Sequence, residues 1–175
     1  MAKTTSESPG TEAIRALAVE QLRFPPTGGT GPQLDKLMTG FKEVRIDQKG
    51  RFFIPASFRD SLGGGEPVHA FVPVDHRGVW IFSEREFKGL IASALENARR
   101  PINHGNPLET VTLLMNRSER IEPDSHHRIL LGPDLLRASG LARGELAVVV
   151  GSGNFLELKT AGEIKPPSSI DTGRN

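Results

Sequence analysis

The chain has 175 residues, a formal net charge of +1 at pH 7, a pI near 8.2 and no cysteine. The lack of cysteine excludes a disulfide framework and a thiolate metal site, and the small net charge means that nucleic-acid binding must come from a local basic patch. This length fits one ordinary domain or two small units with a shared core, and units of about 50–60 residues favour pairing within the chain, oligomerisation or both.

Residues 1–38 are expected to form a flexible N-terminal extension. Glu12 to Leu22 can form a short helix, which at this length is marginally stable without a surface to dock on. The run Phe24-Pro-Pro-Thr-Gly-Gly that follows is typical of a linker. An ordered arm that docks on the folded part is the alternative. At the other end, glycine, proline and serine dominate residues 160–175, which predicts a disordered tail.

The stretch from Val44 to Arg59 predicts a strand, a tight turn, a second strand and a short helix. Apolar and polar residues alternate at its start, as in a half-buried strand. Gly50 can supply the positive φ that a three-residue hairpin loop needs at its last position. Arg51-Phe52-Phe53-Ile54 predicts the returning strand. Pro55 ends that strand and suits the first turn of a helix, where its missing N–H costs nothing.

The middle of the chain predicts two further strands and a long helix. Strands are expected over Val68–Val74 and Val79–Phe82, joined by a polar turn. Ser83 and Glu86 have the spacing of a capping box, so the helix should run from Glu84 to about Ala98. Its apolar stripe is expected to face the core and consists of Phe87, Leu90, Ile91, Ala94 and Leu95.

A second helix should begin at Asn106-Pro107, which combines a cap with proline at the first helical position. Its apolar face is expected to be Val111, Leu114 and Met115. Further along, a short helix near Pro133–Ser139 should end at Gly140. Two apolar runs then predict a hairpin, with strands at Glu145–Gly151 and Phe155–Lys159.

Residues Ile121 to Leu136 repeat the pattern of the first stretch in degraded form. Asp124 and Arg128 lie 77 residues beyond Asp47 and Arg51 (124 − 47 and 128 − 51). In both places a short helix, an apolar strand, a turn and another strand follow. A repeated unit changes the prediction of the whole fold, and here it predicts an α+β protein built from two similar halves.

Two D-x-x-x-R units, each followed by a short strand and a short helix, resemble the MraZ family of bacterial transcriptional regulators, and each unit resembles the AbrB-type swapped-hairpin DNA-binding fold. The resemblance covers roughly Thr39 to Lys159, and D-x-K-G-R followed by I-P-A-x-F-R is its most specific part. It implies two pseudo-repeated swapped-hairpin units, at residues 39–117 and 118–159, in a ring-like homo-oligomer larger than a dimer. It also implies recognition of double-stranded DNA and control of the cell division and cell wall gene cluster.

The two Asp–Arg pairs admit two interpretations. Asp47 and Arg51 flank the first turn and should face each other, as should Asp124 and Arg128 at the second. In one interpretation, Arg51 enters a DNA groove, where its guanidinium can bind guanine O6 and N7. In the other, each pair only stabilises its own turn, and both turns need it equally.

The side chains around the two turns differ in charge. Basic residues flank the first turn, at Lys42, Arg45, Lys49 and Arg59, whereas Glu119, Glu122, His126 and Leu136 occupy the matching positions of the second. Because phosphates attract cations and binding releases counterions, the first turn is suited to DNA and the second is not. The candidate DNA-binding residues are therefore Arg51, Lys49, Arg45, Arg59 and Lys42, and the structural ones Asp47, Asp124 and Arg128. For Arg45 and Arg59 a solvated charge or a weak surface ion pair is the alternative.

Other motifs have less support. Asp124, His126 and His127, with His104, suggest a metal site, but neighbouring side chains on a strand or turn point apart and no established ligand spacing is present. The glycines at residues 63–65 lack the G-K-[ST] of a phosphate-binding loop. No nucleophile elbow frames a serine. We therefore expect no metal, no cofactor and no enzymatic activity.

The sequence predicts a sequence-specific DNA-binding transcriptional regulator. No apolar run approaches the length of a membrane span, and the N-terminus lacks the apolar core of a signal peptide. A cytoplasmic protein associated with the nucleoid is therefore expected. The alternative is a structural or protein-interaction oligomer with the same fold that does not read DNA, which the small net charge favours.

Overall fold

The computed structural model describes residues 37–73, 76–98 and 107–163. The strands in this part of the chain are β1 (Phe41–Arg45), β2 (Arg51–Phe53), β3 (Val68–Phe71), β4 (Val79–Ser83), β5 (Ser118–Ile121), β6 (Arg128–Leu130), β7 (Leu146–Gly151) and β8 (Phe155–Thr160). The helices are α2 (Ala56–Arg59), α3 (Glu84–Ala98), α4 (Pro107–Arg117) and α5 (Pro133–Ser139), and a 3₁₀ turn, η2 (Ala161–Glu163), follows β8. The fold is mixed α+β, as the sequence predicts, and its strands pair in antiparallel fashion.

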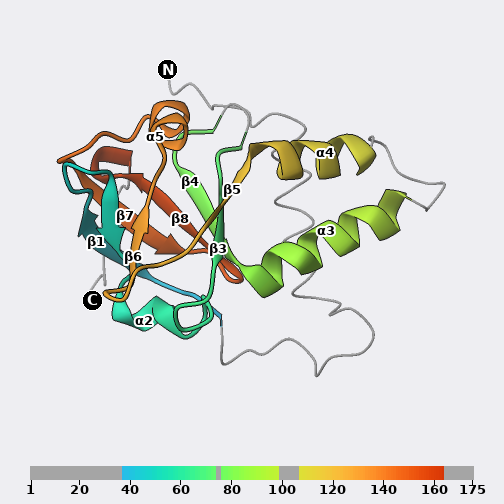
Figure 1. Cartoon of the computed structure of the whole chain (residues 1–175), viewed down its shortest axis with the longest axis horizontal. Helices are drawn as coiled ribbons and strands as arrows, with labels where there is room; N and C mark the ends of the chain where they lie inside the picture. Colours follow the sequence, from blue (N-terminus) through green and yellow to red (C-terminus); the bar gives the residue numbers. More distant parts are fainter. Residues whose placement is uncertain (1–36, 74–75, 99–106, 164–175) are drawn as a thin grey trace, which may run out of the picture.

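The strands form two sheets (Figure 1). Six of them make one sheet in the order β1-β7-β8-β4-β3-β5, and β2 pairs with β6 in a separate two-stranded sheet. Strands from the two ends of the chain interleave, because β1 pairs with β7, β3 with β5 and β4 with β8. The earlier and later parts of the chain therefore complete each other's sheets.

The hairpin predicted on either side of the first turn does not form, and this prediction is wrong. The turn itself closes locally, but β1 then pairs with β7 and β2 with β6, so the two flanking strands separate. In the second sheet, Phe52 lies opposite Ile129, Arg51 opposite Leu130, and Phe53 opposite Arg128. The short strand β2 buries Phe52 only by crossing to the later part of the chain, and this long-range burial outweighs local return of the strand.

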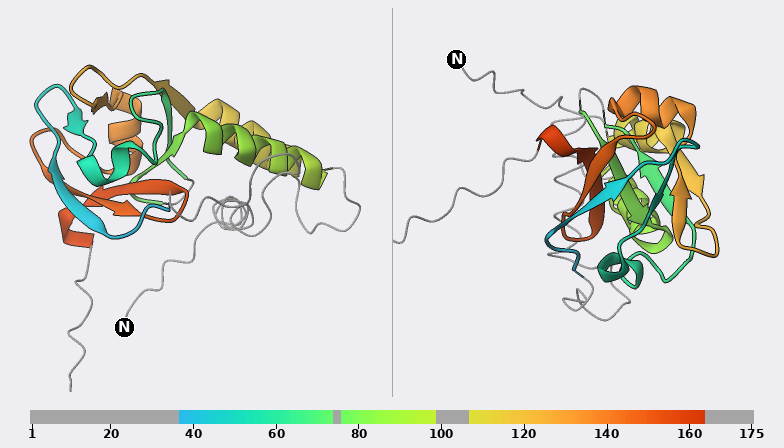
Figure 2. Two further views of the ribbon diagram at one scale, coloured as in Figure 1. Left: turned by 90° about the horizontal axis from the view of Figure 1, so that it is seen from below. Right: turned by 90° about the vertical axis from the view of Figure 1, so that its left-hand side faces the viewer.

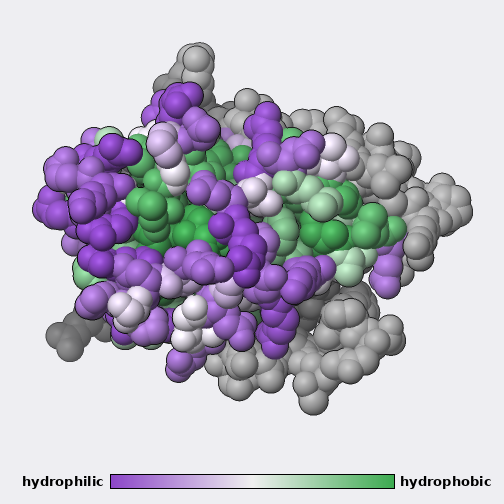
Figure 3. Space-filling model, viewed as in Figure 1, coloured by the Kyte–Doolittle hydropathy of each residue, from purple (hydrophilic) through white to green (hydrophobic). Residues whose placement is uncertain are grey.

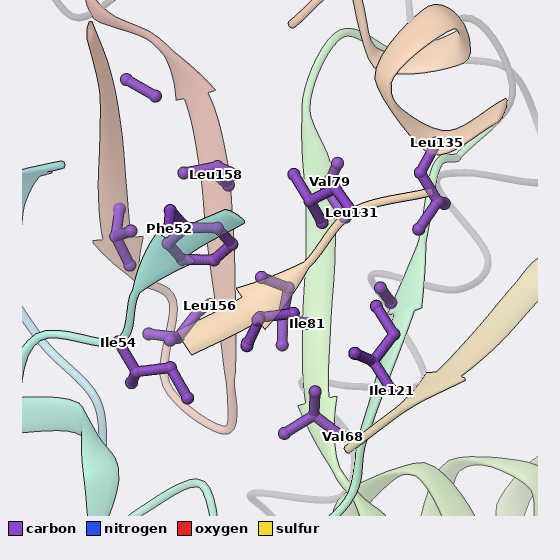
Figure 4. Packing of buried hydrophobic residues seen from close by; sticks show 14 of the residues in the cluster. Phe52, Ile54, Val68, Val79, Ile81, Ile121, Leu131, Leu135, Leu156 and Leu158 are labelled. Carbon is purple, nitrogen blue, oxygen red and sulfur yellow. The ribbon is translucent and has the colours of Figure 1, made fainter. Parts of the chain in front are cut away.

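The main core lies between the two sheets (Figure 4). The close view shows Phe52 and Leu131 directed toward Val79, Ile81 and Leu156, which come from the large sheet. Successive side chains of a strand point to opposite faces, so Val79 and Ile81 of β4 enter this core. Trp80 and Phe82 of β4 enter a second core on the opposite face of the sheet.

The second core is aromatic and is covered by α3 and α4. Phe82 and Trp80 contact Phe155, with ring centroids 5.0 and 4.9 Å apart. Phe87 and Leu90 of α3 and Leu114 of α4 complete this cluster. Figure 2 shows the two helices running together away from the sheets. Because both faces of β4 are covered, every residue of that strand is buried.

Helix α3 begins where the capping pattern predicts. The Glu86 N–H donates to Ser83 Oγ at 3.2 Å, while the Glu86 carboxylate pairs with Arg85 at 2.7 Å. Leu95, which is assigned to the core-facing stripe of α3, is instead 42% exposed. That expectation is wrong, because the apolar stripe is wider than the surface that the helix buries. On the apolar face of α4, Met115 is 62% exposed.

At the start of the described residues, Met38 is 2% exposed. Its backbone exchanges two hydrogen bonds with Gly153, at 2.7 and 2.9 Å. Residues 1–36 of the expected N-terminal extension lie outside the described residues. Of the tail expected at residues 160–175, Thr160 is the last residue of β8 and Ala161–Glu163 form η2, whereas residues 164–175 lie outside the described residues.

Candidate nucleic-acid interface

The first turn, residues 47–51, is organised by one carboxylate. Asp47 Oδ1 accepts hydrogen bonds from the backbone N–H groups of Lys49 (2.8 Å) and Arg51 (2.9 Å). Asp47 Oδ2 accepts from Arg51 Nε at 2.8 Å. The backbone closes with Asp47 N to Arg51 O at 2.7 Å and Gly50 N to Asp47 O at 3.0 Å. The expectation that Asp47 and Arg51 face each other is confirmed.

The second turn, residues 124–128, has the same bonds. Asp124 Oδ1 accepts from the N–H groups of His126 (2.9 Å) and Arg128 (3.0 Å), and Oδ2 accepts from Arg128 Nε at 2.7 Å. The backbone again closes between Asp124 and Arg128, at 3.0 Å, and between His127 and Asp124, at 2.8 Å. The expected facing of Asp124 and Arg128 is likewise confirmed.

The two arginines are held to different extents. Arg128 also brings Nη2 to 2.7 Å from Asp124 Oδ2, and its guanidinium carbon lies 5.7 Å from the centroid of the Phe53 ring. Across β2 and β6, the residue opposite Arg51 is the aliphatic Leu130. The terminal nitrogens of Arg51 donate to no described residue. Of the two arginines, Arg51 is therefore the one whose terminal N–H groups have no partner among the described residues and can bind a ligand.

The hydrogen bonds lower the pKa of both aspartates. For Asp47 the main cause is the backbone N–H of Arg51, followed by the opposing effect of desolvation and by the side chain of Arg51. For Asp124 the side chain of Arg128 is the main cause and lowers the pKa to about 2. Both carboxylates are therefore ionised at neutral pH, and each offsets one arginine charge.

Each turn is joined to the opposite part of the chain by one further backbone bond. Leu131 N donates to Gly50 O at 3.0 Å, and Ile54 N donates to His127 O at 2.9 Å. Gly50 has φ +89° and His127 has φ +57°, the only positive φ among the described residues other than glycine. The positive φ predicted for Gly50 is confirmed.

Three basic side chains gather at the first turn. Lys49 is exposed on the turn itself. Arg45 is also exposed and donates from Nη1 to Gly144 O at 3.0 Å. The third is Arg143, because a methyl group built on Gly50 would lie 3.7 Å from Arg143 Nε. Arg143 was not among the sequence candidates, because it is far from the first turn in the sequence and no local pattern links the two.

Two predicted candidates lie away from the first turn. Lys42 is three residues before Arg45 on β1, a separation of about 10 Å along a strand that turns their side chains to opposite faces. Arg59 donates from Nε to Ile54 O at 3.0 Å, and Ile54 N is the group bonded to His127. The structure therefore places Arg59 near the second turn.

The second turn has a mixed charge environment. Glu122, which matches Arg45, is exposed and pairs with Arg120 at 3.0 Å. His126, which matches Lys49, is exposed beside Ser125. The remaining counterparts differ as well: Glu119 has its pKa raised by burial and by Asp134, and Leu136 is 6% exposed. Cations thus gather more closely at the first turn than at the second.

Among the described residues, no group of three or more histidine, aspartate or glutamate side chains is placed to hold a metal ion. His104, suggested as a further ligand, lies outside those residues. No helix in the described part of the chain is both long and apolar enough to cross a lipid bilayer.

Comparison with known proteins gives a consistent result. Residues 37–102 match the family described as "MraZ protein, putative antitoxin-like". The chain is 32% identical over 122 residues to the transcriptional regulator MraZ of Arthrobacter sp., covering 70% of this chain and 80% of that protein. It is 35% identical over 124 residues to the regulator of the same name from Nocardia farcinica, again covering 70% and 80%. The chain therefore belongs to the MraZ family.

Proposed function

We propose that this chain is a sequence-specific DNA-binding transcriptional regulator whose first turn contacts the DNA. The observation that carries the proposal is the difference between two turns with the same backbone bonds. The first turn gathers Arg45 and Lys49 and leaves the terminal nitrogens of Arg51 without a partner among the described residues. The printed names of the relatives, transcriptional regulators, support the same role.

The three side chains have different roles in the proposed contact. Lys49 and Arg45 bind phosphates, which fixes the position of the turn on the duplex without reading its sequence. Arg51 keeps Nε on Asp47 and directs its free terminal nitrogens to a base edge, with guanine the preferred base in the major groove. Lys42 and Arg59, which lie away from the turn, contribute less.

We further propose that residues 39–117 and 118–159 are pseudo-repeated swapped-hairpin units and that the chain forms a ring-like homo-oligomer larger than a dimer. Large apolar side chains remain exposed on the single chain, among them Phe41, Phe53, Leu130 and Leu146. Figure 3 shows apolar surface over the strands and between α3 and α4, separated by hydrophilic residues. Several turns on one rigid assembly would raise the effective concentration for repeated DNA elements.

The proposed setting is the cytoplasm, at the nucleoid, with control of the cell division and cell wall gene cluster. A structural or protein-interaction oligomer is the second candidate. The feature that favours it is the presence of the Asp–Arg pair in both turns, because a pair that only stabilises the turn is needed twice.

Measuring Arg51→Ala and Arg128→Ala side by side distinguishes the two candidate functions. Affinity for duplex DNA from upstream of the protein's own operon, and for a random duplex of equal length, is followed by fluorescence anisotropy at several salt concentrations. Arg51→Ala should lose about 1–3 kcal/mol of binding free energy and part of the preference between duplexes. Arg128→Ala should bind as wild type does once its assembly is confirmed.

Thermal melting of the same variants is the control for folding. If the pair only stabilises its turn, both variants lower the melting temperature by similar amounts, and any loss of DNA binding follows unfolding. Equal binding losses from the two variants, or wild-type binding by folded Arg51→Ala protein, would contradict a DNA-reading role for the first turn.

A further inference from the structure

The loop between α5 and β7 is fastened to the first turn and the end of β1. Gly144 N donates to Ile46 O at 2.8 Å, and Gly144 O accepts from Arg45 Nη1 at 3.0 Å. The Gln48 side-chain nitrogen lies 2.6 Å from where a Cβ on Gly144 would be. Position 144 favours glycine because its φ is +80°, a conformation that residues with a side chain rarely adopt.

Arg143 is carried to the first turn by this attachment. Its Nε lies near Gly50, which contributes no side chain to separate them. The Arg143 side chain is exposed and makes no ion pair with any described residue. Arg45 is held on the neighbouring carbonyl of Gly144. Arg143 and Gly144, the residue that binds Arg45, are neighbours in the α5–β7 loop. The loop therefore brings Arg143 and Arg45 together, although they are far apart in the sequence.

The loop that approaches the second turn has no such cation. Gly65 is its point of contact, because a Cβ on Gly65 would lie 4.0 Å from His127 Cε1. The residue before Gly65 is Gly64, and the residue before Gly144 is Arg143. The loop that packs against the first turn thus adds a positive charge, and the loop that packs against the second turn adds none.

We infer that the DNA-binding surface is composite and that Arg143, from the α5–β7 loop, binds a DNA phosphate beside the first turn. The inference rests on the proposed function and adds to it a residue from the other half of the chain. A guanidinium that is exposed, unpaired and adjacent to two further cations is suited to a phosphate group. The surface is then complete only when the two halves are paired.

The test measures binding of the full-length protein to the same upstream duplex, for wild type, Arg143→Ala, Arg143→Lys and Arg137→Ala. Arg137 is a matched control, since it is exposed on α5 and its only ion pair with a described residue is with the exposed Asp134, at 2.9 Å. Arg143→Ala should weaken binding about 3- to 10-fold and reduce the slope of log K against log salt by about one unit. Arg143→Lys should restore the slope, and Arg137→Ala should leave both unchanged.

The outcomes separate this inference from the proposed function. Wild-type protein that binds neither the upstream nor the random duplex overturns both. Wild-type binding with an unchanged slope in Arg143→Ala protein overturns the inference and leaves the proposed function in place. Equal losses from Arg143→Ala and Arg137→Ala also overturn it, because they indicate a general charge effect. Melting temperatures confirm that every variant is folded, which is expected for an exposed side chain.

Discussion

The two turns of this protein have the same pattern of backbone hydrogen bonds but differ in the side chains around them. Both are organised by an aspartate that accepts two backbone N–H bonds and one from an arginine Nε. At the first turn, Arg45 and Lys49 are exposed. At the second turn, Arg128 makes more contacts than Arg51 does, and Glu122 occupies the position that matches Arg45. The comparison teaches that the Asp–Arg bonds build the turn, and that its neighbours determine what it can bind.

The largest expected effect comes from the contact between β2 and β6, the strands that follow the two turns. Phe52 and Ile129 lie opposite each other in β2 and β6 and are 1% and 0% exposed. Phe52→Ala should lower the free energy of unfolding by about 3–5 kcal/mol, and Ile129→Ala by about 2–5 kcal/mol, because each leaves a cavity between the sheets. Urea unfolding measures both.

Phe53→Ala is the control for this pair, since Phe53 is 54% exposed and adjacent in sequence. It removes the contact with the Arg128 guanidinium, for which the expected loss is about 0.5–1 kcal/mol. A cost below that of Phe53→Ala for either buried residue would show that the β2–β6 sheet does not hold the earlier and later parts of the chain together.

The next effect concerns the fourth residue of each turn. Gly50→Ala should destabilise the protein by about 1–3 kcal/mol, because φ is +89° and the new Cβ would lie 3.1 Å from Leu131 O. His127→Gly should gain up to about 1 kcal/mol, because His127 holds φ +57° and its buried Nδ1 has no hydrogen-bond partner among the described residues. Thermal melting of the two variants should therefore shift in opposite directions.

A loss of stability in His127→Gly protein as large as that in Gly50→Ala protein would contradict this account. It would mean that contacts of the imidazole ring, rather than the backbone conformation, determine the stability of the second turn. His127→Asn is a useful third variant, because asparagine tolerates positive φ better than most residues with a side chain.

Local chemistry explains which features the sequence predicts. The start of α3 at Ser83, the end of α5 at Gly140 and the Asp47–Arg51 contact each depend on residues a few positions apart, so spacing alone finds them. The pairing of β2 with β6 depends on burial of Phe52 by the later part of the chain, which no local pattern encodes.

The same cause separates the predicted site from the observed one. Arg45 and Lys49 are near the first turn in sequence and in space. Arg59 is near it only in sequence, because the crossing of β2 carries Ile54 and Arg59 toward His127. Arg143 is near it only in space, through the contact of its loop with Gly50. Long-range strand pairing thus moves Arg59 away from the first turn and brings Arg143 to it.

The smallest expected difference between the turns is in their response to acid. The pKa of Asp124 is lowered to about 2, and that of Asp47 is lowered as well. A carboxylate whose pKa is lower in the folded state stabilises the protein above its unfolded value of about 4, and this contribution is lost as the pH falls through the folded value. Stability should therefore decline between about pH 4 and pH 2, with a contribution from each turn.

Urea unfolding of wild type, Asp47→Asn and Asp124→Asn between pH 7 and pH 2 measures these contributions. Each variant should be less stable than wild type at pH 7 and should lose less on acidification, with the larger flattening in Asp124→Asn. Glu84, whose pKa Lys88 and His69 lower to about 2, adds to the decline in all three proteins, so only the differences between them are informative. Parallel curves for wild type and Asp124→Asn would show that the Asp124–Arg128 pair does not stabilise the fold, and that the two turns do not share the role of their aspartates.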